Sequence, residues 1–342
     1  MTLNAKTRRF ENIKFLYVDD EPDNLEAFEI TCSDDFEVLT AADPIAALET
    51  VRNEPDLAVV LVDQIMPRMT GLQFAVEAKK IRPALTFIMI TGNATKQLAV
   101  DSIRSKVIWE FLEKPVSFGS PETRQLFVSA VQQHLLEKVK LEYHEGTIRL
   151  ISQLIDDKDG HTRRHSERVT DWSMKIAKKF DLSEREMIMV YEGALLHDIG
   201  KISIPDDILK KPGRLTELER KIIMTHPARG GDLLESVPQL KELAPIARYH
   251  HERPDGTGYP QGLKGTQIPL VSSIVAIADF FEALSAKRPY KEAWAISDIA
   301  AEIARVRGQQ FPEEVVDALF AVLAEEGLIE KEKVAKFQKT AA

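Results

Sequence analysis

Two hydrophobic patterns divide the chain, and the first covers residues 14–115. Short apolar runs alternate there with stretches of helical periodicity, and the runs lie at residues 15–18, 36–39, 57–62, 87–90 and 107–111. Continuous apolar strands separated by helices are typical of a parallel sheet that is covered on both faces. We therefore predict a doubly wound α/β domain with a parallel five-stranded sheet, whose ligands lie beyond the carboxyl ends of the strands.

The second pattern is helical throughout. Residues 122–143 are predicted to form one long helix, along which apolar side chains step by four at Phe127, Val131, Leu135 and Val139. Such a stripe is a weak coiled-coil signal, so a homodimer through this helix is one interpretation. From residue 146 onward no alternating strand pattern occurs, which predicts an all-α helical bundle. We expect an α/β domain over residues 1–120, a helical linker over 121–145 and the bundle over 146–342.

Composition narrows the classes of function. The 342 residues are 44% hydrophobic, which is enough for packed cores. The net charge of −9 argues against broad affinity for nucleic acid polymers or anionic membranes. Cys32 is the only cysteine, so an intrachain disulfide and a thiolate metal site are both excluded. No run approaches the ~18 apolar residues of a membrane span, and residues 1–10 lack a signal peptide's apolar stretch. We expect a soluble, cytoplasmic protein.

Polar residues follow the predicted strands of the first half. Asp19 and Asp20 end the first strand, Asp63 ends the third, and Thr91 and Lys114 end the last two. In a doubly wound sheet these ends converge on one edge, where three carboxylates repel one another unless a hard cation such as Mg²⁺ joins them. The lysine and the threonine would contact phosphoryl oxygens, so the pattern predicts phosphorylation of an aspartate. Acidic residues that merely cap helices are the alternative.

This half resembles the receiver domain of bacterial response regulators. The matching motifs are Val18-Asp-Asp-Glu21, Leu61-Val-Asp-Gln-Ile-Met-Pro67 with Gly71, Thr91-Gly92 and Lys114-Pro115. The resemblance implies that Asp63 is the phosphoacceptor and that a cognate sensor histidine kinase is a partner. It implies that Mg²⁺ is held by Asp19, Asp20, Asp63 and the backbone carbonyl of Ile65. The implied switch residues are Thr91, Lys114 and Phe111, for which a plain core phenylalanine is the alternative.

Six of the eight histidines fall between residues 161 and 251. They are His161, His165, His197, His226, His250 and His251. Asp198 follows one of them, and Asp279 lies within an apolar run, where a buried carboxylate without a partner would cost several kcal/mol. Imidazole and carboxylate donors without thiolate suit first-row divalent metals such as Fe, Mn, Zn or Ni. The set predicts more than one metal site, although any single histidine is more often a surface or core residue.

The second half resembles the HD-GYP branch of the HD phosphohydrolase superfamily. His197-Asp-Ile-Gly-Lys201 is similar to the HD signature, and His250-His-Glu-Arg-Pro-Asp-Gly-Thr-Gly-Tyr-Pro260 is similar to the GYP signature. Further matches in the family's order are His165-Ser-Glu-Arg-Val169, Lys211-Pro-Gly-Arg-Leu215, His226-Pro227, Ala278-Asp279 and Arg288-Pro-Tyr-Lys291. The resemblance implies a response regulator with a metal-dependent phosphodiesterase that hydrolyses cyclic di-GMP to pGpG, GMP or both.

Two or three divalent metal ions, iron or manganese above all, are implied at this site. The implied ligands are His165, His197, Asp198, His226, His250, His251 and Asp279. Asp198 would bridge two cations, and a pair of cations ~3.5–4 Å apart can hold a bridging hydroxide as the nucleophile. Lys201 would contact a phosphate oxygen or assist proton transfer. Arg288, Lys291 and Tyr259 would bind the substrate, with a plain turn residue as the alternative for Tyr259.

The chain departs from that family at three positions. His161 stands where relatives with a third metal carry glutamate, so it is expected either to bind a third cation or to face solvent. Glu282 replaces an aspartate and Pro254 replaces an aromatic residue, which could alter substrate fit or turnover. Two other functions stay open: a cyclic di-GMP receptor and interaction module with little catalysis, and a phosphodiesterase of another cyclic dinucleotide. Diguanylate cyclase (GGDEF) proteins are further candidate partners.

Overall fold

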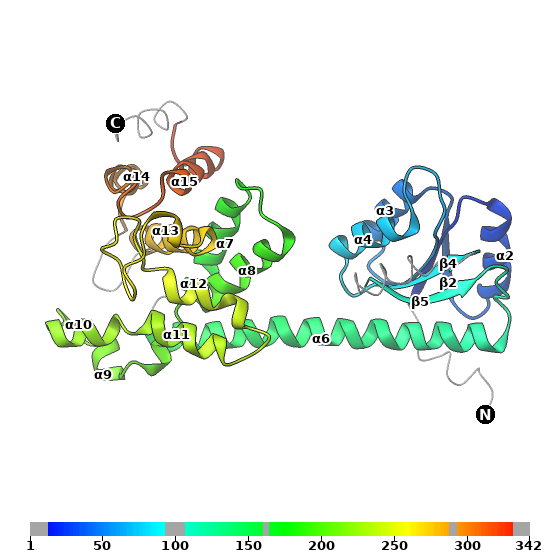
Figure 1. The fold of residues 1–342 in the computed structure, drawn as a ribbon, viewed down its shortest axis with the longest axis horizontal. Coiled ribbons are helices and arrows are strands. Elements are labelled where there is room, and N and C mark those ends of the chain that lie inside the picture. Colours follow the sequence, from blue (N-terminus) through cyan, green and yellow to red (C-terminus); the bar gives the residue numbers. More distant parts are fainter. Residues whose placement is uncertain (1–12, 93–106, 160–163, 287–292, 331–342) are drawn as a thin grey trace. The chain divides into compact units, whose positions relative to one another are not determined.

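The computed structural model describes residues 13–92, 107–159, 164–286 and 293–330 (Figure 1). The chain separates into two compact units, Met1–His144 and Glu145–Ala342. The division falls inside one continuous helix, α6 (Pro121–Asp159). Each unit has hydrophobic cores of its own.

The first unit is a parallel sheet covered by helices. The strands run in the order β2-β1-β3-β4-β5, and every neighbouring pair is parallel. The strands are β1 (Lys14–Val18), β2 (Glu37–Ala41), β3 (Leu57–Asp63), β4 (Thr86–Thr91) and β5 (Ile108–Glu113). The described helices of this unit are α2 (Pro22–Cys32), α3 (Pro44–Asn53), α4 (Gly71–Ile81) and the first part of α6. The predicted doubly wound α/β fold with five parallel strands is confirmed.

Side chains that alternate along the strands build one core on each face of the sheet. In β1, Tyr17 faces a core shared with α2 and α6, whereas Leu16 faces a core shared with α3 and α4. The strand order reverses between β1 and β3, and a doubly wound sheet binds its ligands beyond the carboxyl ends of the strands at such a reversal. Asp19 and Asp63 lie at those two ends.

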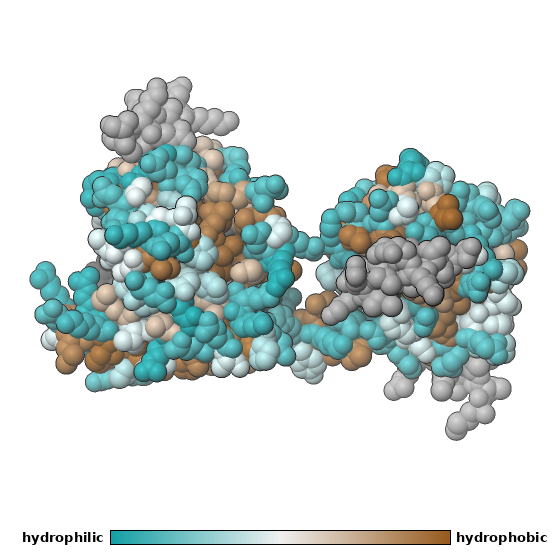
Figure 2. Space-filling model, viewed as in Figure 1, coloured by the Kyte–Doolittle hydropathy of each residue, from teal (hydrophilic) through white to brown (hydrophobic). Residues whose placement is uncertain are grey.

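The beginning of α6 completes the first of these cores. Phe127 and Val131 are fully buried there, whereas Leu135 and Val139 are 39% and 43% exposed. The interpretation of the predicted stripe as a dimer contact is therefore wrong for Phe127 and Val131, because these two side chains cover the sheet. Farther along, α6 carries exposed apolar side chains, and hydrophobic surface is visible along the helix in Figure 2. They are Leu136, Leu141, Tyr143, Leu150 and Leu154.

In its described residues the second unit consists of helices joined by loops, with two isolated bridges between single residues and no strand. After the end of α6, its α-helices are α7 (His165–Ala177), α8 (Glu184–Leu196), α9 (Asp206–Leu209), α10 (Glu217–Ile223), α11 (His226–Glu235), α12 (Ala244–Tyr249), α13 (Leu270–Ser285), α14 (Ile296–Arg305) and α15 (Glu313–Glu325). Short 3₁₀ helices span Ile199–Ser203, Lys241–Leu243 and Gly265–Gln267. The predicted all-α bundle is confirmed.

Helix α13 is the centre of the second unit. It packs against α7, α8, α12, α14 and α15, and its apolar side chains, such as Ile277 and Phe281, are buried. A helix that is apolar nearly all round is expected in such a position. Asp279 and Glu282 are its charged residues, so the fold brings two carboxylates into the interior of the bundle. Within the described ranges, no helix combines the length and the apolar character needed to cross a membrane.

Candidate functional sites

The first site lies where β1, β3 and β5 end. Lys114 Nζ lies 2.5 Å from Asp63 Oδ1 and 3.2 Å from Asp19 Oδ2. Tyr17 donates its hydroxyl hydrogen to the same oxygen of Asp19 over 2.5 Å. The Ile65 amide donates to Asp63 Oδ2 over 2.7 Å. Two buried carboxylates from neighbouring strands therefore share one ammonium group.

Burial and charge oppose each other in this site. Burial raises the pKa of Asp63 above its usual value, against the lowering effect of Lys114 and of the Ile65 amide. Burial would lower the pKa of Lys114, but its hydrogen bonds to Asp63 and Asp19 raise that pKa overall. Because the lysine balances one of the two carboxylates, a divalent cation at this edge would stabilise the remaining negative charge.

The other predicted residues of this site lie on the same strands or just beyond them. Asp20 is exposed, Thr91 at the end of β4 is buried, and Phe111 in β5 is half-buried. Gly71 begins α4 against the end of β3: a side-chain carbon there would lie 2.3 Å from the backbone oxygen of Asp63. Glycine at this position therefore lets the loop after β3 close tightly below the aspartate.

Seven predicted metal ligands meet inside the second unit. They come from five segments: the start of α7 (His165), the end of α8 (His197, Asp198), the start of α11 (His226), the end of α12 (His250, His251) and the middle of α13 (Asp279). Gly200 allows α11 to approach the HD segment, because a side-chain carbon there would lie 1.9 Å from the backbone oxygen of His226. The close packing of these segments brings the ligands together.

The donor atoms form two clusters, one on each side of Asp198. The clusters are His165, His197 and Asp279, and His226, His250 and His251, and the donor atoms within each lie within 4.8 Å of one another. Asp198 Oδ2 lies 3.3 Å from His197 Nε2, and Asp198 Oδ1 lies 3.1 Å from His226 Nε2. One carboxylate thus faces both clusters, as expected of a ligand that bridges two cations.

The histidine rings are fixed through their Nδ1 atoms. Those of His197, His226 and His250 donate to the backbone oxygens of Ala194, Ile223 and Ala247 over 2.7, 2.8 and 2.9 Å. Nδ1 of His165 lies 2.5 Å from Glu282 Oε2. A hydrogen on Nδ1 leaves the lone pair on Nε2, which is the tautomer that coordinates a metal through Nε2. The rings are therefore oriented for coordination.

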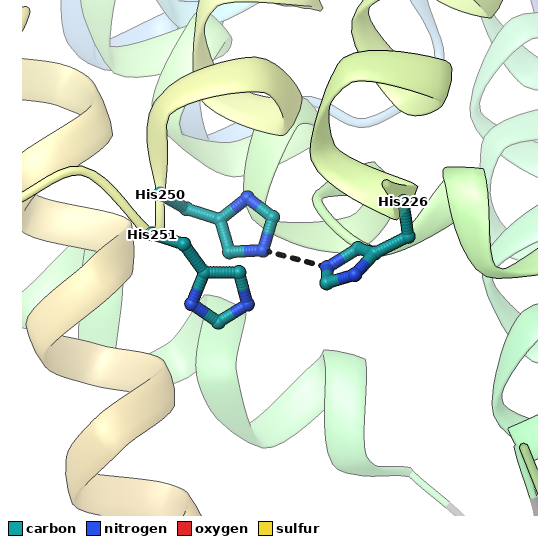
Figure 3. Close-up of side chains that lie close together, drawn as sticks. All are labelled: His226, His250 and His251. Atoms are coloured by element: carbon teal, nitrogen blue, oxygen red, sulfur yellow. Dashed lines mark hydrogen bonds between the residues drawn. The ribbon is translucent and has the colours of Figure 1, made fainter. Parts of the chain in front are cut away.

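Figure 3 shows the rings of the second cluster converging. Nε2 of His226 and Nε2 of His250 lie 3.3 Å apart. Because both rings donate from Nδ1, two Nε2 lone pairs face each other in the neutral state, and a cation between them would remove their repulsion. In the first cluster, Nε2 of His197 is buried and makes no hydrogen bond with any residue that the structure describes. Both clusters therefore fit divalent metal ions.

The two clusters differ in charge state. Burial and the neighbouring His251 lower the pKa of His250 well below its usual value. Burial, with a smaller effect of His226, lowers the pKa of His251 to about 4. Burial would also lower the pKa of His165, but Asp279 and Glu282 raise it to about 10. His250 and His251 of the second cluster are thus held neutral, whereas a metal that binds His165 must displace a proton.

The contacts that Asp159, Glu282 and Arg168 make around these ligands are not predicted from the sequence. Lys201 Nζ lies 2.6 Å from Asp198 Oδ2 and 2.5 Å from Asp159 Oδ2. Glu282 contacts His165 and is held in turn by Arg168, whose Nε and Nη2 lie 2.7 and 2.6 Å from Glu282 Oε1. Arg168 and Glu282 each lie three residues after a predicted ligand, His165 and Asp279, on the same helix, and that spacing places them near the site. No such signal in the sequence marks Asp159.

The loop after α12 brings Tyr259 onto the second cluster. The ring of Tyr259 stacks on that of His251, with centroids 4.8 Å apart and planes inclined by 22°. The buried carboxylate of Glu252 fixes this loop by accepting hydrogen bonds from the amides of residues 261, 262 and 263. Burial raises the pKa of Tyr259 to about 12, so its hydroxyl stays a hydrogen-bond donor at neutral pH. His161, Arg288 and Lys291 lie outside the described residues.

Comparison with known protein families identifies the two units. Residues 15–123 match the response regulator receiver domain, and residues 149–315 match the HD domain. An HD domain implies divalent metal binding, and the two clusters of histidine and aspartate donors lie within the matched range.

Two named relatives match over most of this chain, and a third matches less than half of it. A cyclic di-GMP phosphodiesterase response regulator of Xanthomonas campestris is 35% identical over 83% of this chain and 80% of its own length. A cyclic di-GMP phosphodiesterase of Thermotoga maritima is 33% identical over 83% of each chain. A 3′3′-cGAMP-specific phosphodiesterase of Vibrio cholerae is 41% identical over 45% of this chain and 34% of its own. This chain therefore belongs to the family of response regulators that join a receiver domain to an HD domain.

Proposed function

We propose that the HD domain of this response regulator is a metal-dependent phosphodiesterase that hydrolyses cyclic di-GMP. The observation that carries the proposal is Asp198, whose two carboxylate oxygens face two separate clusters of metal-binding donors. Two bound divalent cations would activate a water nucleophile and neutralise the phosphodiester. The imidazole and carboxylate donor set suits iron or manganese. Two relatives that match 83% of this chain are named for the same substrate, which supports it.

The side chains around the clusters then bind and orient the substrate. Lys201, 2.6 Å from Asp198, is placed to contact a phosphate oxygen or to assist proton transfer to the leaving group. Tyr259 is held against His251 and donates a hydrogen bond to a phosphate oxygen. Arg288 and Lys291 bind the second phosphate of the doubly anionic ligand, an assignment that comes from the sequence motif alone.

A phosphodiesterase of another cyclic dinucleotide is the second candidate. The observation that favours it is the Vibrio cholerae relative named as specific for 3′3′-cGAMP, which is 41% identical over the 154 residues matched. Cyclic dinucleotides share their phosphate chemistry, so the metal ligands serve either substrate. A receptor with little catalysis is less well supported, because it has no need for a bridging carboxylate between two clusters or for a lysine beside it.

We also propose that phosphorylation of Asp63 by a sensor histidine kinase controls this activity, with Mg²⁺ held by Asp19, Asp20, Asp63 and the carbonyl of Ile65. Helix α6 supports such control because it has buried contacts in both units: Phe127 lies in a core of the first, and Asp159 touches Lys201 in the second.

We further propose a homodimer through α6. Three exposed apolar side chains follow one another at seven-residue spacing along this helix, which supports a helix-to-helix contact: Leu136, Tyr143 and Leu150. Diguanylate cyclases remain candidate partners, and the cytoplasm remains the expected location of the protein.

Product analysis tests the proposed activity. Protein purified without oxygen and loaded with Fe²⁺ or Mn²⁺ is incubated with cyclic di-GMP and, in parallel, with 3′3′-cGAMP, and the products are separated by chromatography. We expect pGpG or GMP from cyclic di-GMP, and no product from a variant that carries His197→Ala and Asp198→Ala. His144→Ala, a histidine outside both clusters, serves as the matched control. Binding without hydrolysis would favour the receptor, and faster cleavage of 3′3′-cGAMP the second candidate.

A third cation held by His161 remains a prediction. Under saturating metal, the wild-type protein should bind about one equivalent more than His161→Ala, while both keep the two cations of the described clusters. Equal metal content in the two proteins would show that His161 is not a ligand.

A further inference from the structure

Lys201 is an ammonium group enclosed between two carboxylates. Its Nζ lies 2.5 Å from Asp159 Oδ2 and 2.6 Å from Asp198 Oδ2. The side chains of Lys201, Asp159 and Asp198 are 13%, 7% and 8% exposed, so water screens these charges poorly. The pair between Lys201 and Asp159 joins the 3₁₀ helix Ile199–Ser203 to the last residue of α6.

A divalent cation on each side of Asp198 changes the balance of charge at this lysine. Asp198 then shares its negative charge with the cations, and it no longer neutralises Lys201. The ammonium group would stand next to two cations, and its repulsion would weaken metal binding unless another anion compensates it. Asp159 is that anion in the described part of the site, because it is the other carboxylate that contacts Nζ.

The end of α6 holds Asp159 in place. Ile155, one turn earlier, is buried in a core of the second unit. Asp156 accepts hydrogen bonds from the amide (3.2 Å) and the hydroxyl (2.6 Å) of Ser166, close to the metal-facing His165. The helix end is therefore packed and hydrogen-bonded to α7, so the carboxylate of Asp159 has little freedom to follow Lys201 if the lysine moves.

We propose that Asp159 is a positioning residue for the metal centre: it supplies the counter-charge that holds the ammonium group of Lys201 in place beside Asp198 while two divalent cations are bound. This inference rests on the proposed metal-dependent function. Asp159 is also the point at which α6 contacts the active site of the second unit. The same helix has side chains in a core of the first unit. Asp159 acts through Lys201 and is not itself expected to touch the substrate.

Metal affinity in a double-mutant cycle tests the proposal. The full-length variants are Asp159→Asn, Lys201→Met and the double variant, and the control is Asp157→Asn, which removes the same charge from an exposed position on the same helix. Mn²⁺ affinity is measured by competition with a chelator, and kcat and KM for cyclic di-GMP are measured in parallel. Circular dichroism and melting of the metal-free proteins establish that each variant is folded.

We expect Asp159→Asn to weaken binding of the more weakly held Mn²⁺ by roughly tenfold or more, the usual range for a partner of a metal ligand. In the Lys201→Met background the same substitution should change the affinity less than about twofold, because no ammonium group is left to compensate. Asp157→Asn should bind as the wild type does. An unchanged affinity in Asp159→Asn, or an equal loss in both backgrounds, would overturn the proposal.

The affinity cycle and the hydrolysis assay fail independently. If no variant, nor the wild type, cleaves a cyclic dinucleotide, the proposed function is wrong, while the pattern of Mn²⁺ affinities still decides the role of Asp159. If hydrolysis occurs but the cycle is additive, the proposed function stands and Asp159 is only a structural ion-pair partner.

Discussion

The two sites of this protein differ in the residues that carry their charge and in how the fold brings these residues together. In the first unit, carboxylates at the ends of neighbouring strands share one lysine, and Asp20 remains exposed. In the second unit, imidazoles predominate, four of them fixed through Nδ1, and the ligands come from five segments. Proximity in the first site follows from strand order alone, whereas proximity in the second depends on how the helices pack. The donors differ too: carboxylate oxygens suit Mg²⁺, and imidazoles suit iron or manganese.

The largest effect should come from the acceptor of the first site. Asp63→Asn removes the carboxylate that lies 2.5 Å from Lys114, so phosphorylation by acetyl phosphate with Mg²⁺ should be lost entirely. Intact mass spectrometry measures the added phosphoryl group. Asp34→Asn, at an exposed position of the same unit, should be phosphorylated like the wild type. Equal phosphorylation of Asp63→Asn would contradict the assignment, because the carboxylates at the strand ends would then have another function.

The corresponding change in the second site is Asp198→Asn. An amide in place of the carboxylate that faces both clusters should prevent two cations from binding together. The loss of stabilisation amounts to several kcal/mol, which corresponds to a decrease in kcat of about 10²–10³-fold. Metal analysis should show fewer equivalents per chain, while Asp63→Asn should keep the full content. A variant with both metals and wild-type kcat would show that Asp198 does not bridge.

What the sequence predicts follows the same division. Strand ends carry Asp19 and Asp63 into one site because a doubly wound sheet leaves no other arrangement, and the signature motifs mark the histidines and aspartates of the second. The contacts around the metal ligands are not predicted, because the partners are far apart in the sequence. Glu282 is 117 residues from His165, and Lys201 is 42 residues from Asp159. Such pairs depend on helix packing and on side-chain rotamers. The apolar stripe on α6 is ambiguous for a similar reason. Apolar side chains at this spacing pack equally well against a sheet of the same chain or against a second helix.

A third prediction concerns the support of the imidazoles. Glu282→Gln leaves His165 with a neutral partner in place of the carboxylate that lies 2.5 Å from its Nδ1. Outer partners of metal ligands typically contribute about 10–100-fold in affinity, so the first cluster should bind its metal more weakly by that factor. The second cluster should be unaffected, and chelator titration should therefore show one tight and one weakened cation. Glu242→Gln, which changes a surface partner of Arg185, is the control. Equal weakening of both cations would contradict this assignment.

The smallest effect should come from a histidine that shares the Nδ1 geometry but belongs to neither cluster. His134 donates from Nδ1 to the backbone oxygen of Ala84 over 2.9 Å, and burial lowers its pKa below the ordinary 6.5. Below pH 6.5 the unfolded chain therefore binds a proton that the folded chain resists, so stability falls as the pH falls through that window, by at most about 1.4 kcal/mol per pH unit for one group. Thermal unfolding of the wild type and of His134→Asn at pH 7.5 and 5.5 measures the effect. The wild type should lose more stability than the variant, which keeps a donor for the carbonyl but does not titrate. If both proteins lose the same amount of stability, His134 is not the buried neutral group that its hydrogen bond indicates. It would then not serve as a structural imidazole with which the metal-binding imidazoles can be compared.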